Sequence, residues 1–397
     1  MKKILFVMIS AVVVYAIANA RPQYSMLTGN RCLACHVHEK GGGARDMLGA
    51  YTKSSVSLIP IKGTATGDFF NDLAKYNSFM NGKALVGLDF RFQSAKLGGP
   101  VNNERKYFSM QFSPYLTYTP VKWLHFTGHY NFIDMLYDNL SIYEDFQIYQ
   151  GQQTWSASVQ IKPDPRYPSL RAGFFMPSVG NKFDDHTLMI RQITTQIFAR
   201  PFIPPDCAEL GAEVSYDGLK WLNLTAGVFN SESMAEINYG GTQLSGEGKA
   251  TPLLRAAFLP RFFNNQLNTN IGGSYFFNED FYIANAFVHL GWTDKISLIT
   301  EYMHYDQDDL LSVDNFLVEL LYQIDPALTL SGRIEDASTE DLISGDVPME
   351  YNSMQYVVGA NIYFLPFMEF RPEYRIFDRD EAESYSSQWT FQLHLYY

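Results

Sequence analysis

Five residues near the N-terminus, Cys32-Leu33-Ala34-Cys35-His36, have a spacing that suits covalent cofactor chemistry. Two thiols separated by two residues can add to the vinyl groups of a haem, and the histidine that follows can bind the iron as an axial ligand. The alternatives are a structural disulfide, a thioredoxin-like redox pair or half of a zinc site. No βα pattern surrounds the pair and no second cysteine pair exists, so we expect one covalently bound haem c.

The sixth ligand of the haem iron is open at this stage. Met47 follows His36 by eleven residues and could fold over the opposite face of the haem. A methionine ligand would raise the reduction potential relative to a second histidine. The alternatives are Met26, a more distant ligand from the rest of the chain, water or no ligand. Arg45 could pair with a haem propionate, or be a solvated residue of a short helix.

The first twenty residues predict a secretory signal peptide. Lys2 and Lys3 form a charged start, an apolar run follows over 4–17, and Ala18-Asn19-Ala20 is a small-x-small cleavage site. We expect cleavage near Ala20, with an uncleaved anchor as the alternative. Export would take the chain across the inner membrane, where covalent haem attachment takes place.

The rest of the chain is typical of β-structure. Of its 397 residues 15% are aromatic, the formal net charge is −12, and no long apolar run follows the signal. Polar and apolar residues alternate in segments such as 84–92, and most clearly in 389–397. There Thr390, Gln392, His394 and Tyr396 share one face of a strand, opposite an apolar face.

Short turns and long polar connections also alternate along the chain, as they do in transmembrane barrels of the outer membrane. This rhythm predicts an all-β fold, a transmembrane outer-membrane β-barrel of about sixteen strands with both ends in the periplasm. A soluble β-sandwich is the alternative. The expected strands start near 84, 107, 121, 154, 169, 208, 220, 251, 268, 281, 296, 313, 327, 351, 367 and 387. The domains are therefore a signal peptide (1–20), a monohaem cytochrome c segment that plugs the lumen (21–80) and a porin-like barrel (81–397).

The longest predicted loop, 176–207, contains a second group of candidate ligands. Asp184, Asp185 and His186 carry oxygen and nitrogen donors suited to a divalent metal such as iron, and could form a metal-entry site. The alternative is a polar constriction loop without bound metal. Cys207, which is left over from the haem motif, is expected to be a small buried side chain.

Haem motif and barrel together resemble the fused cytochrome–porins, outer-membrane proteins of iron-oxidising bacteria. Beyond C-x-x-C-H, the resemblance rests on Arg45, Gly49 and Tyr51. The proline usual after the haem histidine is missing, and residues 37–43 stand in its place. The barrel shows no metal motif that matches the family.

The resemblance implies an electron conduit rather than a soluble carrier. Single electrons would pass through the enclosed haem from an extracellular donor, such as Fe²⁺, to a periplasmic c-type cytochrome or another carrier, with Fe(II) oxidation at the cell surface. The alternatives are a solute channel with a haem-bearing plug or sensor, and the same conduit run outward to reduce extracellular metal. We expect contact with outer-membrane lipid and no nucleic-acid partner.

Overall fold

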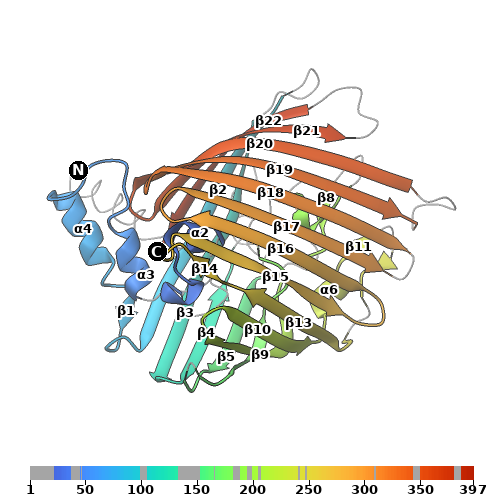
Figure 1. Cartoon of the computed structure of the whole chain (residues 1–397), viewed down its shortest axis with the longest axis horizontal. Helices are drawn as coiled ribbons and strands as arrows, with labels where there is room; N and C mark the ends of the chain where they lie inside the picture. Colours follow the sequence, from blue (N-terminus) through green and yellow to red (C-terminus); the bar gives the residue numbers. More distant parts are fainter. Residues whose placement is uncertain are drawn as a thin grey trace.

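The computed structural model describes residues 22–36, 45, 47–98, 105–132, 153–164, 166–181, 188–194, 199–203, 207–239, 242–245, 248–307, 310–342, 349–379 and 386–397. Within them, sixteen long antiparallel strands form one barrel (Figure 1). These strands are β2 (Ala84–Gly98), β3 (Arg105–Val121), β4 (Leu124–Tyr130), β5 (Trp155–Ile161), β6 (Ser169–Phe175), β9 (Glu209–Leu219), β10 (Leu222–Phe229), β13 (Thr251–Phe258), β15 (Leu267–Phe277), β16 (Tyr282–Trp292), β17 (Ile296–Gln307), β18 (Leu311–Asp325), β19 (Leu328–Asp341), β20 (Met349–Leu365), β21 (Met368–Arg379) and β22 (Ser386–Tyr396).

Pairing of the first and last strands closes the barrel. β2 pairs with β3 on one side and with β22 on the other, so that Asp89 lies opposite both Ser113 and Tyr396. A closed sheet leaves no backbone edge exposed to lipid. The prediction of sixteen strands is confirmed, and each predicted start agrees with the structure to within three residues.

Side-chain burial alternates along the strands because successive residues point to opposite faces. In β17, Ile299, Glu301 and Met303 are buried inside the barrel, whereas Tyr302 points outward. In β22 the predicted split is confirmed, since Thr390, Gln392, His394 and Tyr396 are buried. The barrel thus has a distinct inner surface that can hold chemistry.

The two ends of the barrel differ. The short-turn rim is formed by the turns at 122–123, 220–221, 293–295, 326–327 and 366–367; the long-loop rim is the opposite end. All five tryptophans are exposed on the outer surface at one of these rims: Trp123, Trp221 and Trp292 at the first, Trp155 and Trp389 at the second. Aromatic girdles of this kind mark the two membrane–water interfaces. Among the helices that the structure describes, none is long and apolar enough to cross a membrane.

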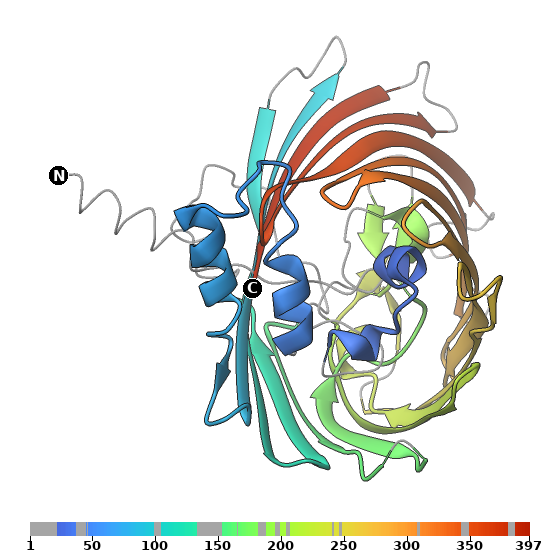
Figure 2. The same ribbon diagram turned by 60° about the vertical axis from the view of Figure 1, so that its left-hand side comes forward.

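The N-terminal segment enters the barrel at the short-turn rim (Figure 2). It contains α2 (Pro22–Thr28), the 3-10 turn η1 (Cys32–Ala34), α3 (Met47–Lys53), α4 (Ala65–Leu73) and β1 (Ser78–Phe79). Helix α2 packs against β15, β16 and β17 inside the barrel. The chain then crosses the rim, where the Leu58 N–H donates to the Tyr363 carbonyl (2.7 Å). Figure 2 shows α3 and α4 on opposite sides of the strands that carry the C-terminus.

The connection between β6 and β9, called here the inner loop (residues 176–208), folds into the lumen. It contains η2 (Met189–Arg191), β7 (Gln192–Thr194) and β8 (Ala199–Pro201). The remaining short elements are β14 (Arg261–Phe262), α6 (Glu232–Ala235), β11 (Asn238–Tyr239) and β12 (Thr242–Gln243). Toward the long-loop rim, β2 extends through Gly98 and β19 through Asp341.

Candidate haem site

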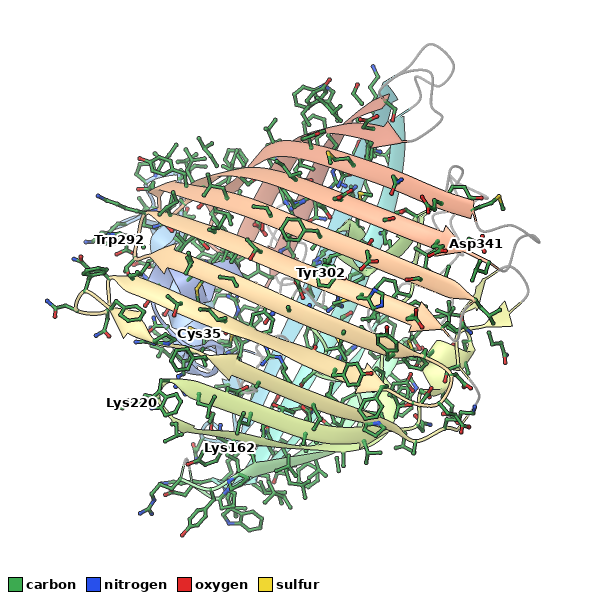
Figure 3. The ribbon with its side chains drawn as sticks, turned by 45° about the vertical axis from the view of Figure 1, so that its right-hand side comes forward. Cys35, Lys162, Lys220, Trp292, Tyr302 and Asp341 are labelled. Atoms are coloured by element: carbon green, nitrogen blue, oxygen red, sulfur yellow. The ribbon has the colours of Figure 1, made fainter. Side chains whose placement is uncertain are left out.

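The C-x-x-C-H motif forms one helical turn inside the barrel. The His36 N–H donates to the Cys32 carbonyl (2.9 Å), and the Cys35 N–H donates to the same oxygen (3.1 Å). Residues at positions i, i+3 and i+4 of a helical turn lie on one face, so both thiols and the imidazole share a face. Neither cysteine is in a disulfide. Figure 3 places Cys35 toward the short-turn rim, near the end that carries Lys220.

Arg45 lies directly beside this turn. Its backbone forms an isolated β-bridge with His36, and its guanidinium lies 4.7 Å from the ring centre of Tyr396. The side chain is only 6% exposed, yet Nε and Nη1 have no hydrogen-bond partner. A buried cation without acceptors is costly, and a carboxylate such as a haem propionate would satisfy it. The residues present therefore fit a covalent haem.

Gly49 has a structural reason to be glycine. A Cβ at this position would lie 2.3 Å from the carbonyl oxygen of Cys35. Helix α3 can therefore pack on the backbone of the haem motif only where a side chain is missing. This explains one of the residues on which the family resemblance rests; the side chain of Tyr51, another of them, lies outside the described residues.

The structure leaves two sequence predictions untested. Met47 is the first residue of α3, but its side chain is not among those described, so its role as sixth ligand stays a prediction. Asp184, Asp185 and His186 lie outside the described residues as well. Within the part of the chain that is described, no group of three His, Cys, Asp or Glu side chains is placed to hold a metal ion.

Helix α2 anchors the haem motif to the barrel wall. Asn268 donates to the Met26 carbonyl (3.1 Å), and the Asp294 N–H donates to that of Leu27 (2.8 Å). At Gly291 a Cβ would lie 2.4 Å from the Met26 oxygen. The missing side chain in β16 thus lets the helix backbone approach the sheet.

Further contacts tie the segment to other strands. The Arg31 guanidinium donates to the carbonyls of Asp217 (3.2 Å) and Leu219 (2.9 Å), at the β9–β10 turn. On another side, the hydroxyls of Tyr24 and Tyr363 are hydrogen bonded, and the Lys53 ammonium lies over both rings. The segment is therefore held by several parts of the barrel wall.

An apolar cluster covers one side of the lumen. It includes Met26 of α2, which is 3% exposed, together with residues of the inner loop and inward-facing residues of β10, β13 and β15–β18. Its members include Phe175, Val179, Leu188, Ile190, Ile193, Phe202, Phe229, Phe276, Ile283, Ile299, Met303, Tyr305, Leu317 and Leu321. Cys207 belongs to the cluster, and burial raises the pKa of its thiol, as expected for a structural cysteine. Packed apolar side chains exclude water from this part of the barrel.

Polar contacts hold the inner loop in place within this cluster. Asn315 donates to the carbonyls of Met189 and Gln192 (both 2.9 Å). The Met189 N–H donates to Glu335 (2.5 Å), and the Thr194 N–H donates to Thr339 (3.2 Å). The described part of the loop is thus fixed inside the barrel by contacts with β18 and β19.

The inner surfaces of β19–β22, β2 and β3 are polar instead. Arg333 contacts three carboxylates, those of Glu335 (2.5 Å), Glu319 (3.5 Å) and Glu373 (3.5 Å). Arg371 also pairs with Glu373 (2.5 Å). All five side chains are buried, and their opposite charges compensate one another within a site shielded from water.

Two inward-facing residues near the haem motif escaped the sequence analysis. His289 in β16 is completely buried, and Arg255 in β13 interacts electrostatically with Cys32. The signal was the alternation in "YIANAFVHLGW", where Asn285, Phe287 and His289 share a face opposite small and aliphatic residues.

No family model matches the chain, and no curated protein matches it. Solved structures do. A structure of OprB from Pseudomonas putida superposes with a TM-score of 0.57 at 12% identity, covering 79% of this chain and 94% of that one. A loop-deletion mutant of OmpT from Vibrio cholerae gives 0.51 at 11% identity (79% and 99%). The anion-selective porin of Comamonas acidovorans gives 0.51 at 8% identity (79% and 99%). The chain has the fold of outer-membrane porins.

Proposed function

We propose that the protein carries single electrons across the outer membrane through a haem held inside its barrel. One observation carries this proposal: the C-x-x-C-H turn lies inside a barrel in which a cluster of buried apolar side chains covers one side of the lumen. Cys32 and Cys35 would form the thioethers, His36 would bind the iron, and Arg45 would meet a propionate. The haem supplies one-electron oxidation and reduction of its iron.

The protein's own residues position and insulate this centre. Helix α2 packs on β16 at Gly291 and so holds the haem motif inside the barrel, against its wall. The apolar cluster excludes water between the motif and the long-loop rim. The short-turn rim would face the periplasm, as in other outer-membrane barrels, and both described ends of the chain would then lie on that side. A periplasmic cytochrome would then exchange electrons at this rim, and Fe²⁺ would be the donor on the outside.

Reduction of the haem across a sealed membrane tests the proposal. Purified protein is reconstituted into vesicles with the short-turn rim inward, and Fe²⁺ is added only outside under anaerobic conditions. We expect the absorbance of the reduced haem to appear. His36→Ala should abolish it while the barrel stays folded, because strand closure does not involve the motif. If the wild-type haem stays oxidised with external Fe²⁺ but is reduced by a reductant on the inside, the protein does not carry electrons inward from Fe²⁺.

A solute channel is the second candidate, and the polar inner surface of β19–β22 favours it. The named porin neighbours share this fold at low identity, which supports the architecture and no substrate. In planar bilayers a channel should show steady open-state current, whereas a plugged conduit should not. Replacing Asp184, Asp185 and His186 together should slow haem reduction only at low Fe²⁺, if those residues collect the ion.

A further inference from the structure

His289 lies on the inner surface of the barrel, on the strand that packs most closely against helix α2. It is in β16 and is 0% exposed. Its inward neighbours on the strand, two residues away in each direction, are Phe287 and Gly291. The Phe287 and His289 rings are 5.3 Å apart, so the imidazole is fixed against an aromatic neighbour.

One of these neighbours touches the N-terminal segment, and the other contacts Arg255 on β13. Gly291 packs on the backbone of Met26, where a Cβ would lie 2.4 Å from the carbonyl oxygen. Phe287 lies under the guanidinium of Arg255, 5.1 Å from its ring centre, and Arg255 interacts electrostatically with Cys32. On its strand, His289 therefore lies between Gly291, which touches helix α2, and Phe287, which contacts Arg255.

We propose that His289 is the sixth ligand of the haem iron, supplied by the barrel wall opposite His36. This inference rests on the proposed function. Imidazole is a common axial ligand of haem iron. A wall ligand couples the haem to the barrel as well as to its own segment, so that the centre is fixed from both sides.

The other histidines that the structure describes on strands contact polar groups outside α2, as His125 does through Nδ1 with Thr119 (2.9 Å). His394 contacts Glu369 through Nδ1 (3.0 Å) and Asp89 through Nε2 (3.1 Å). His304 pairs with Asp314 (2.9 Å), away from the lumen. His129 is bonded through Nδ1 to Ser156 (2.8 Å) on β5, whereas α2 packs mainly against β16 and β17.

The ligand set has a consequence for the reduction potential. Two imidazoles give a lower potential than an imidazole with a methionine. Arg255, a buried cation on β13, would oppose this by favouring the reduced, less positive haem. We therefore expect His289 and Arg255 to shift the potential in opposite directions when each is replaced.

The experiment uses the purified full-length protein with its haem. Electron paramagnetic resonance and near-infrared magnetic circular dichroism identify the axial ligands of the oxidised haem. The wild type should show a low-spin haem with two imidazoles. His289→Ala should lose that signal and regain it with added imidazole. His289→Met should instead show the signature of methionine ligation, with a raised potential, while Arg255→Gln should lower it.

Control variants separate ligand loss from damage to the barrel. His129→Ala, which removes another inward-facing histidine, and Met47→Ala should leave the wild-type spectrum unchanged. Heat modifiability on gels reports that each barrel is folded. Methionine ligation in the wild type that is lost in Met47→Ala, or a bis-imidazole signal that survives in His289→Ala, would overturn the assignment. Absence of covalent haem from the wild type would instead refute the proposed function itself.

Discussion

The two halves of the barrel's inner surface differ in chemistry. The apolar wall, made of the inward faces of β10, β13 and β15–β18, packs against Met26 and the inner loop. The polar wall, made of the inward faces of β19–β22, β2 and β3, carries polar pairs such as the ion pair of Arg333 with Glu335 and the hydrogen bond of His394 with Asp89. One half resembles the core of a soluble protein, and the other resembles the lining of a pore.

The two walls contribute differently to the stability of the filled barrel. The apolar wall gains free energy by burying the plug, at about 25 cal/mol per Å² of apolar surface, and so seals the lumen. The polar wall gains little by burial, because desolvation of its charges offsets their attraction. The N-terminal segment is held from both sides: Met26 packs on the apolar wall, and Ile61 and Phe70 pack in a second apolar cluster with residues of β2, β20 and β22.

The largest expected effect concerns covalent attachment of the haem, which depends on the two motif cysteines and on neither wall. Cys32→Ala together with Cys35→Ala should remove all covalent haem, because no other cysteine pair can form the thioethers. The pyridine haemochrome assay after acid-acetone extraction measures this. Cys207→Ala, which changes a thiol in the apolar cluster, should retain one haem per chain. Haem that survives extraction in the double variant would contradict the assignment of the motif.

On the polar wall, Arg333→Met should destabilise the folded barrel by about 3–5 kcal/mol, because buried carboxylates are left uncompensated. Denaturant unfolding followed by tryptophan fluorescence measures the free energy. Adding Glu335→Gln should restore part of the loss. If Arg333→Met is as stable as the wild type, the charges on this wall are solvated and the lumen there is open to water.

On the apolar wall, Leu317→Ala should cost about 2–5 kcal/mol, since it leaves a cavity in a packed cluster. The matched control is Leu320→Ala on the same strand, which is 47% exposed on the outer surface and should cost much less. The same unfolding assay compares them. Equal effects from the two variants would show that the inner cluster is not tightly packed.

The smallest effect concerns the reactivity of one thiol. Burial raises the pKa of Cys207, so at pH 8 less of it is thiolate than of an exposed cysteine. We expect iodoacetamide to leave it unmodified in the folded protein and to label it after unfolding, as read by mass spectrometry. Rapid labelling of the folded protein would indicate that this part of the apolar cluster opens.

The sequence predicted the barrel well because its strands alternate clearly, as β22 shows with Thr390, Gln392 and His394 facing inward. It did not predict the apolar wall. In β18 both faces carry apolar residues, with Leu317 inward and Leu320 outward, so alternation does not reveal which face is buried in protein and which in lipid.

In the candidate site, too, some residues could be predicted from the sequence and others could not. Cys32, Cys35 and His36 could be identified from local spacing, because the chemistry needs those residues within one turn. His289 could not, because its relation to the motif depends on how β16 and α2 pack across more than two hundred residues of sequence. The inward path of the inner loop depends likewise on tertiary contacts, such as those made by Asn315.

The most direct test follows haem absorbance and ion leakage together, in the same sealed vesicles, after Fe²⁺ is added outside. The central claim is that electrons cross the barrel while solutes do not. We expect the haem to be reduced while an ion gradient across the vesicle membrane persists. Rapid collapse of the gradient, with a haem that stays oxidised, would contradict the account and identify the protein as an open channel.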